Sequence, residues 1–266
     1  MKKYFTILKT EWQRQLTYRL NFIGFRLGNL VEISSQLVVW FALFHLFPTI
    51  QGYTLNQMVT YVIIGWLFSF FTTNFAFEMI ISKQITTGEI SNFLLKPISY
   101  IRYILVLSVG RISMALFSSV LLQAGFILVF WNYLVAPVSF SVFFLIIPML
   151  LISYFINLFF AILMGLCSFW TTETDGIHYA FRYALRFFTG AFFPINLFPL
   201  SLLQVFLVFP FVYSFYVPMQ LYLGKMNFHQ GITGLGIQLV WLIISYGLVK
   251  YMWNVGVKKK YEGIGI

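Results

Sequence analysis

Charged residues are scarce in this chain. Asp, Glu, Lys and Arg make up 9% of its 266 residues, whereas a soluble domain usually carries about a quarter. Residues 33–77, 112–172 and 187–224 contain none of the four. A helix in a bilayer pairs its own backbone groups and needs only apolar side chains outside, so such stretches suit hydrocarbon. The composition predicts an all-α integral membrane protein, with residues 1–266 forming one membrane domain.

Cysteine and the common catalytic motifs are also nearly or wholly missing. Cys167 is the single cysteine and lies in an apolar run, which argues against a disulfide framework or a cysteine-based metal site. The sequence contains no GxxxxGK[ST] phosphate loop and no HExxH, GxSxG or CxxC motif. We therefore expect no catalytic residue, no metal site and no bound cofactor on this chain.

Six apolar segments are predicted to cross the bilayer, whose hydrocarbon core needs about 20 helical residues. Pro148 lies inside the fourth and is expected to kink it or to end an interfacial lead-in. The predicted spans are residues 21–47, 56–81, 112–130, a segment within 140–170, 179–193 and 232–253.

Basic residues gather at alternate ends of these spans. The loops on one side hold only Lys225, so the positive-inside rule predicts an even number of spans with both termini cytoplasmic. The net charge of +10 is spread along span ends, which favours anionic membrane lipids over nucleic acid as partners. The basic side comprises Lys2, Lys3, Lys9, Arg14, Arg19, Lys83, Lys96, Arg102, Arg111, Arg182, Arg186, Lys258, Lys259 and Lys260.

Prolines interrupt the apolar stretch at residues 194–224. Pro194, Pro199, Pro210 and Pro218 divide it into pieces of roughly ten residues, too short to cross a bilayer. The pieces are too apolar for an ordinary loop, so we expect a re-entrant hairpin of short helices in the outer leaflet. A full seventh span would place the C-terminus outside, against the charge pattern.

The first 20 residues predict an amphipathic helix on the membrane surface. Phe5, Leu8 and Trp12 recur at helical spacing, while Lys2 and Lys9 fall on another face. A simple charged flank that orients the first span is an equally good interpretation.

A polar stripe runs along the first predicted span. Asn29, Glu32 and Gln36 follow one another at i, i+3 and i+7, and Arg26 and Glu78 are expected at a similar depth. A carboxylate inside the membrane is costly and needs a partner or water. The stripe, with Glu78, either lines a pathway or forms a buried polar clasp between helices.

Glu173, Asp175 and His178 form the tightest polar cluster, in the loop after the fourth span. Carboxylate and imidazole groups within one turn could hold a cation. A solvated loop, with Asp175 near the start of the next helix, is the simpler interpretation.

The linker at residues 83–97 is the most distinctive polar segment. Thr87 is a plausible cap for a short helix that begins at Gly88 and stops before Pro97. Ile90, Phe93 and Leu94 would then share one exposed apolar face. Such a face could sit in a groove on another protein or lie on lipid.

Residues 85–98 begin with Ile-Thr-Thr-Gly-Glu and end with Leu-Leu-Lys-Pro-Ile, and this run resembles the segment after the second span of ABC-2-type transporter permeases. The amphipathic N-terminus, six spans, interrupted outer segment and basic tail resemble the same family. The resemblance implies that the linker is a coupling helix, in which Gly88, Glu89, Ile90, Phe93 and Leu94 contact a separate ATPase. The N-terminal helix would be the membrane-surface helix beside it.

The resemblance further implies an ATP-driven exporter in the cell membrane. Two copies of the ATPase would bind ATP and Mg, and a second permease, identical or homologous, would complete the pathway. Pairing of two different permeases is plausible in this group. The phenylalanine-rich spans favour a hydrophobic or amphiphilic cargo such as a drug, peptide or lipid-like molecule.

An ion-coupled secondary transporter and an intramembrane enzyme are the alternatives to an exporter. An ion-coupled secondary transporter predicts an internal repeat with paired broken helices, and the sequence has one broken segment without a repeat. An intramembrane enzyme around Glu173, Asp175 and His178 predicts further carboxylates or histidines in other spans, where they are nearly absent.

Overall fold

The computed structural model describes residues 2–17, 19–73, 76–95, 98–171 and 175–261. These residues form helices and connecting turns, with one isolated β-bridge between Ile50 and Tyr53 and no longer strand among them. The α-helices are α1 Lys2–Thr17, α2 Arg19–Leu46, α3 Leu55–Thr72, α4 Phe77–Thr86, α5 Ser91–Leu94, α6 Tyr100–Val129, α7 Phe140–Leu166, α8 Asp175–Phe188, α9 Leu200–Val208, α10 Pro210–Ser214, α11 Tyr216–Tyr222 and α12 Phe228–Tyr261.

Five segments of the described chain are long and apolar enough to cross a membrane, which confirms an all-α membrane protein. The sixth predicted span, residues 179–193, coincides with α8 and the turn after it. Because α8 has 14 residues and a crossing needs about 20, the count of six spans stays a prediction. The five segments are Arg26–Leu46, Leu55–Thr86, Tyr100–Val129, Phe140–Phe169 and Phe228–Val257.

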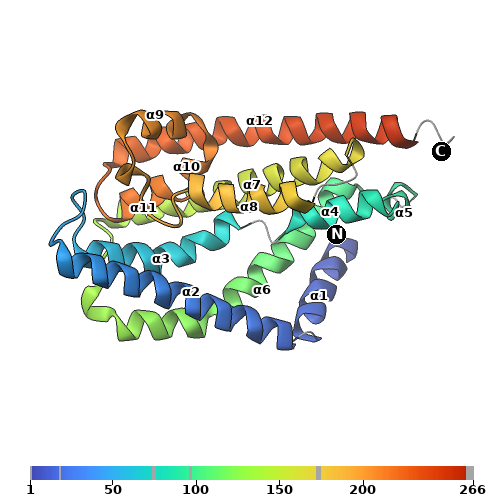
Figure 1. Cartoon of the computed structure of the whole chain (residues 1–266). Coiled ribbons are helices and arrows are strands. Elements are labelled where there is room, and N and C mark those ends of the chain that lie inside the picture. The colour runs from blue at the N-terminus through green and yellow to red at the C-terminus, as the bar shows by residue number, and fades with distance from the viewer. Residues whose placement is uncertain (1, 18, 74–75, 96–97, 172–174, 262–266) are drawn as a thin grey trace.

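Figure 1 shows the helices as an elongated bundle whose long axis follows α12. The start of α1, the short helix α5 and the end of α12 lie at one end, which we call the α5 end. The turn at residues 47–54 and helices α9, α10 and α11 lie at the opposite end. The start of α1 and the end of α12 thus lie at the same end of the bundle, and the cytoplasmic location of both termini stays a prediction.

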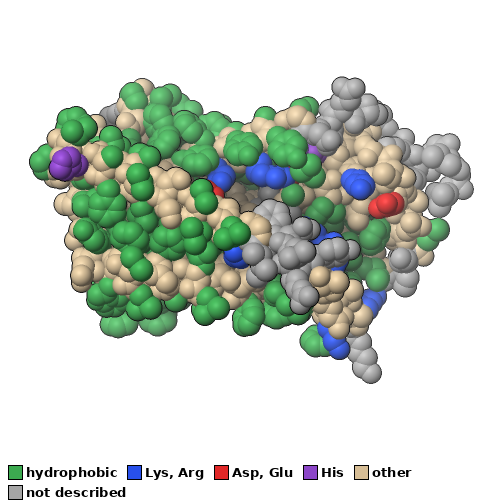
Figure 2. All heavy atoms as spheres, turned by 60° about the horizontal axis from the view of Figure 1, so that its bottom comes forward, with side chains coloured by type: hydrophobic (Ala, Val, Ile, Leu, Met, Phe, Trp, Pro, Cys, Tyr) green, Lys and Arg blue, Asp and Glu red, His purple; other side chains and the backbone are tan. Residues whose placement is uncertain are grey.

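The face shown in Figure 2 is mostly hydrophobic. Its Lys and Arg side chains lie in the middle and toward the α5 end, while the opposite end shows mainly hydrophobic side chains. Helix α7 runs through the interior and packs against α3, α4, α10, α11 and α12. The surrounding helices expose apolar side chains, as expected where lipid is the solvent.

The second predicted span, residues 56–81, is not one continuous helix. Helix α3 ends at Thr72, and α4 begins at Phe77 after Ala76, whose φ is 59°. The hydroxyls of Thr72 and Thr73 both donate to the carbonyl of Ser69, at 3.0 and 2.8 Å. Such side-chain bonds compete with the helical ladder and favour its termination. The predicted span is therefore formed by two helices in succession, and together they make up the candidate membrane segment Leu55–Thr86.

The apolar stretch before the last span forms short helices, as its prolines predict. The segments η3 (Ile195–Leu197), α9, α10 and α11 have nine residues or fewer, so none is long enough to cross a bilayer. Pro199 precedes α9 and Pro210 begins α10. Pro218 lies inside α11 and does not divide it, and Pro148 likewise lies within an uninterrupted α7. Entry of these short helices into the outer leaflet stays a prediction.

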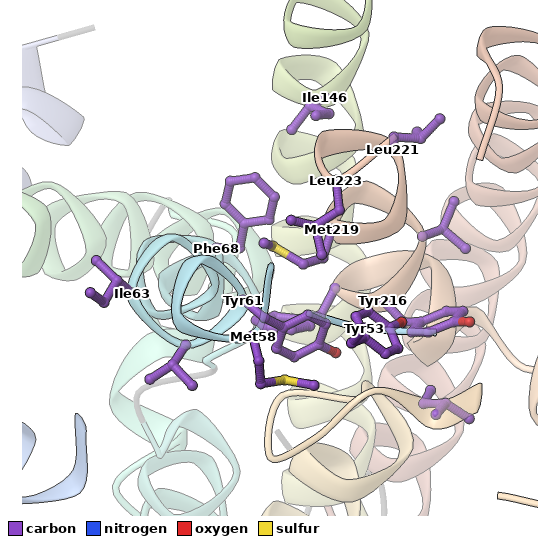
Figure 3. Close-up of a cluster of buried hydrophobic side chains, with 14 of the residues drawn as sticks. Tyr53, Met58, Tyr61, Ile63, Phe68, Ile146, Tyr216, Met219, Leu221 and Leu223 are labelled. Carbon is purple, nitrogen blue, oxygen red and sulfur yellow. The ribbon is translucent and has the colours of Figure 1, made fainter. Parts of the chain in front are cut away.

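Aromatic residues pack the end of the bundle opposite α5 (Figure 3). The Tyr61 hydroxyl donates to the carbonyl of Gly190 at 2.6 Å, and its ring meets Phe215 edge-on at 5.6 Å. A Cβ at Gly65 would lie 2.7 Å from the Phe215 ring, so α3 can approach the short helices only with glycine there. This packing holds the segment of short helices on α3.

Polar contacts close the same end. The Tyr53 hydroxyl donates to Asn196 at 2.9 Å and accepts from Gln220 at 2.6 Å. The Lys225 ammonium donates to the Gly52 carbonyl at 2.6 Å and lies 4.1 Å from the centre of the Tyr53 ring. Burial lowers the pKa of Lys225 and raises the pKa of Tyr53. The turn at residues 47–54 is thereby fixed to the short helices.

Candidate functional site

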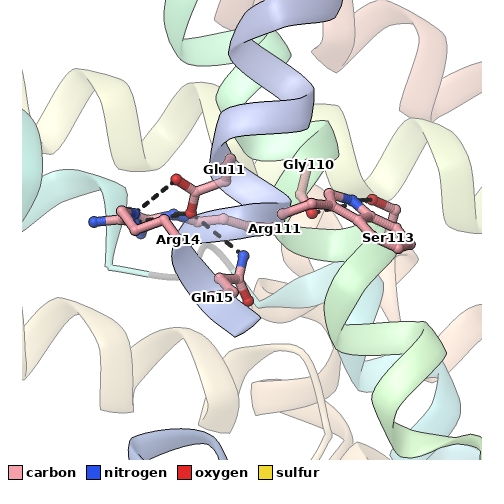
Figure 4. A network of polar contacts seen from close by, with 7 residues as sticks. Glu11, Arg14, Gln15, Gly110, Arg111 and Ser113 are labelled. Atoms are coloured by element: carbon pink, nitrogen blue, oxygen red, sulfur yellow. Dashed lines mark hydrogen bonds and ion pairs between the residues drawn. The ribbon is translucent and has the colours of Figure 1, made fainter. Parts of the chain in front are cut away.

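Helix α1 packs on α6 through a buried carboxylate (Figure 4). Glu11 is 3% exposed, and its Oε1 lies 2.8 Å from Arg14 Nη2 and 3.0 Å from Arg111 Nε. Because Arg111 belongs to α6, this pair joins two helices that are 100 residues apart in sequence. The predicted surface helix is thus part of the folded bundle.

The apolar residues predicted for the membrane-surface helix divide between two roles. Phe5 is exposed and Leu8 is half-buried. Trp12 donates its indole N–H to the Ser113 hydroxyl at 2.9 Å and packs against Phe117 of α6. In Figure 1, α1 runs crosswise to α12 near the α5 end, an orientation that suits a helix in the membrane surface.

The linker folds differently from the predicted helix over residues 88–96. Thr87 is the C-cap residue of α4, and its hydroxyl donates a hydrogen bond to the Lys83 carbonyl at 2.8 Å. Gly88 has a φ of +76°, the left-handed conformation that commonly ends helices and favours glycine. Helix α5 starts only at Ser91. The prediction that Thr87 begins a helix at Gly88 is therefore wrong.

The predicted apolar ridge of the linker faces the protein. Ile90 is fully buried, and the ring of Phe93 lies 5.3 Å from that of Tyr100 and 4.7 Å from that of Tyr103. Only backbone is described for Leu94. The expectation that Ile90 and Phe93 form an exposed face is wrong, because Ile90 is buried in a cluster of several helices and Phe93 packs on two tyrosines of α6.

Three other side chains of this turn are exposed: Glu89, Asn92 and Leu95. We call them the α5 surface. Behind them, Tyr100 stacks on Trp253 of α12 with ring centres 4.8 Å apart, and its hydroxyl donates to Gln84 of α4 at 2.6 Å. The α5 surface therefore rests on a base formed by α4, α6 and α12.

Two arginines one turn apart on α8 bind the membrane carboxylates. Arg182 donates from Nη2 and Nε to Oε1 of Glu78, at 2.6 and 3.1 Å. Arg186 forms an ion pair with Glu32 of α2. Glu78 is fully buried, whereas Glu32 and Arg186 are 31% and 36% exposed. Helix α8 thus connects α2 with α4.

The rest of the predicted polar stripe lies beside these pairs. Asn29 and Gln36 are half-buried on the face of α2 that carries Glu32. Arg26 donates instead to the Ser118 hydroxyl of α6 at 2.6 Å. The two arginines of α8 were not predicted as partners; their i, i+4 spacing beside apolar residues was the available signal.

Phenylalanines surround the end of α8. Phe187 lies 5.3 Å from Phe198 and 6.4 Å from Phe206, measured between ring centres, and Phe188 lies 5.3 Å from Phe206. The guanidinium of Arg186 lies 4.8 Å from the centre of the Phe192 ring. The half-exposed ion pair with Glu32 therefore adjoins a large aromatic surface.

The structure describes the side chain of only one member of the polar cluster predicted before α8, so the cluster stays a prediction. Glu173 lies outside them, and of Asp175 only the backbone is described. His178 is buried against α7, with Nε2 3.3 Å from the Met164 carbonyl. No group of three metal-ligating side chains occurs in the part of the chain that the structure describes.

Buried amides join α7, α10 and α12, a feature that the sequence prediction missed. Gln238 Nε2 lies 2.8 Å from the Ser153 hydroxyl and 2.7 Å from the Tyr213 carbonyl. Asn157 donates to the Ser214 hydroxyl at 3.0 Å. The bonded residues come from separate helices, so no short sequence pattern indicates that they interact. These bonds fix the short helix α10 to the long helices α7 and α12.

Comparison with known proteins identifies the family. A family model described as "ABC-2 family transporter protein" matches residues 30–265. No curated protein and no solved structure matches the chain. The match covers most of the chain, including the linker, the α8 arginines and the short helices. The chain therefore belongs to the ABC-2 transporter family and is a multi-pass membrane permease subunit.

Proposed function

We propose that this permease works in an ATP-driven exporter, with a separate ATPase subunit bound at the α5 surface. The observation that carries the proposal is the fixed, exposed turn at Glu89, Asn92 and Leu95, presented at one end of the bundle. Its buried Ile90 and stacked Phe93 anchor it to the spans. A turn held in this way can transmit a displacement instead of yielding to it.

The contacts suggest how such a displacement would travel. Helix α4 leads directly into the α5 surface and carries Glu78, which binds Arg182 of α8. One turn further along α8, Arg186 binds Glu32 of α2. A movement of α4 would therefore act on α8 and α2 through two ion pairs, a contiguous physical connection. ATP and Mg on two ATPase copies would bias the two states through their different contacts.

The same region suggests a hydrophobic or amphiphilic cargo. Glu32 and Arg186 form a partly exposed ion pair beside the aromatic surface around Phe187 and Phe206. Charged and aromatic groups side by side suit a molecule with one polar and one apolar part. A second permease, identical or homologous, would close the pathway from the side of α2, whose apolar side chains are largely exposed.

The test is purification of the tagged chain from its native membrane, followed by identification of bound subunits by mass spectrometry. We expect a Walker-motif ATPase with the unaltered chain. Asn92→Arg and Leu95→Asp should release it or abolish ATP hydrolysis stimulated by the permease. The matched control is Asn132→Arg, an exposed asparagine beyond the other end of α6, which should keep the ATPase. Absence of any ATPase, or equal loss with Asn132→Arg, would contradict the proposal.

A further inference from the structure

An apolar groove lies between α1, α6 and α7, and none of its lining residues belongs to α8. Its volume is about 460 Å³. The α1 wall is Tyr4, Phe5 and Leu8, and Phe155 of α7 also lines the groove. The α6 wall is Leu105, Val106 and Val109. Among the lining side chains only Tyr4 carries a polar atom, so the groove suits a hydrocarbon chain.

The groove keeps its shape because α1 is fixed on α6 directly beside it. Glu11 pairs with Arg111, and Trp12 bonds to Ser113. A Cβ added to Gly110 would lie 3.4 Å from the Glu11 side chain, so the helices are in close contact there. The lining residues of both helices precede this contact in sequence, so the groove extends from it toward the starts of α1 and α6.

Three exposed basic residues lie within three positions of lining residues in the sequences of α1 and α6. Lys3 and Lys9 are exposed on α1, immediately before Tyr4 and immediately after Leu8 in the sequence, and the Lys3 ammonium lies 5.8 Å from the Tyr4 ring centre. Arg102 is exposed on α6, three residues before Leu105, a spacing that places both on one side of a helix. The nearby carboxylate of Glu11 is buried and already pairs with two arginines.

We propose that this groove binds an anionic phospholipid, with an acyl chain between α1 and α6 and the phosphate on Lys3, Lys9 and Arg102. Charge complementarity selects the occupant, because an apolar channel bordered by three cations matches a negatively charged headgroup attached to hydrocarbon. The position agrees, since α1 runs crosswise to the long axis near the basic end of the bundle (Figures 1 and 2). This site is separate from the proposed cargo path and does not depend on the ATPase.

The test is native mass spectrometry of the full chain in nanodiscs that contain equal phosphatidylglycerol and phosphatidylcholine. We expect retained phosphatidylglycerol in preference to phosphatidylcholine. Val109→Trp, which fills the groove without changing charge, should remove the retained lipid. Val120→Trp, on the same helix and 60% exposed outside the groove, should not. Equal retention of both lipids, or equal effects of the two tryptophans, would overturn the proposal.

The charges are tested separately. Replacing Lys3, Lys9 or Arg102 by Gln should reduce the preference for phosphatidylglycerol by about fivefold for each charge removed. Lys250→Gln, an exposed lysine of α12, should leave the preference unchanged. A photoreactive phosphatidylglycerol on the unaltered chain gives a result that does not depend on variants folding. Labelling should fall on residues 4–8 and 105–109; labelling elsewhere alone would refute the site.

Discussion

The Glu78 carboxylate is fully buried and receives two N–H groups from Arg182, a residue 104 positions away. Its second oxygen, Oε2, finds no hydrogen-bond partner among the described residues. A buried charge in this situation depends strongly on its single partner. The pair therefore connects α4 to α8, and the loss of either partner should destabilise the fold.

The first prediction concerns that link. Arg182→Gln leaves an uncompensated buried carboxylate and should cost about 3–5 kcal/mol of stability. Adding Glu78→Gln should restore part of this loss, because the unpaired charge is then gone. Thermal unfolding of Arg182→Gln, Glu78→Gln and the double variant in one detergent measures the coupling energy between the two side chains. Additive losses in the double variant would show that the two side chains do not interact.

The Glu32–Arg186 pair provides a comparison within the same helix. Because both side chains are about one-third exposed, solvent and headgroups screen their attraction. The same cycle with Glu32→Gln and Arg186→Gln should yield a coupling of less than about 1 kcal/mol. A coupling as large as that of the buried pair would mean that this site is sealed from water.

The second prediction tests the close contact between α4 and α7. A Cβ at Gly165 would lie 2.7 Å from Ile81 Cβ and 2.9 Å from the Glu78 carbonyl. Gly165→Ala should force the helices apart and cost about 1–3 kcal/mol. Gly236→Ala on α12 is the control, since nothing lies within 4 Å of the added atom. In thermal unfolding, Gly165→Ala should melt at a clearly lower temperature than Gly236→Ala. Equal melting temperatures would refute the contact.

The third prediction concerns the turn that presents the α5 surface. Gly88 has open space around it but a φ of +76°, so alanine is opposed by backbone conformation alone. Gly88→Ala should cost about 1–2 kcal/mol and weaken ATPase binding. Gly28→Ala within α2, also without close neighbours, should be neutral or stabilising. Stability and co-purification are measured on the same preparations; an unaffected Gly88→Ala chain would argue against the left-handed turn.

The fourth prediction concerns the attachment of α1. Trp12→Phe and Ser113→Ala each remove the 2.9 Å hydrogen bond and should each cost about 1 kcal/mol. The double variant should cost little more than either alone. Trp131→Phe replaces an exposed indole and should change stability little. Faster proteolysis of α1 in the first two variants, but not in the third, is the expected accompanying result.

The apolar stretches predicted the helical membrane class because the bilayer requires long apolar helices, and the spacing of prolines predicted the short helices before α12. Helix boundaries within polar-looking segments were harder. The linker was expected to begin a helix at Gly88, but glycine in the left-handed region ends α4 there. The local sequence alone is compatible both with a helix that begins at Gly88 and with a helix that ends there.

The partners of the carboxylates could not be predicted, because they come from distant segments. Glu32 binds a residue 154 positions away, and nothing near Glu32 indicates which arginine the fold will bring. Ile90 illustrates a second limit. An apolar face can be covered by lipid, by another protein or by the same chain, and helical periodicity does not distinguish these. Here Ile90 is buried in a cluster with residues of α4, α6, α7 and α12.

Helix α12 has 34 residues and so extends about 51 Å, well beyond the roughly 30 Å of bilayer hydrocarbon. Its far part brings Trp253 onto Tyr100, next to the turn that carries the α5 surface. An indole stacked at this position is a natural optical probe. With the other six of the seven tryptophans replaced by phenylalanine, the emission of Trp253 would follow events at the α5 surface without any attached dye.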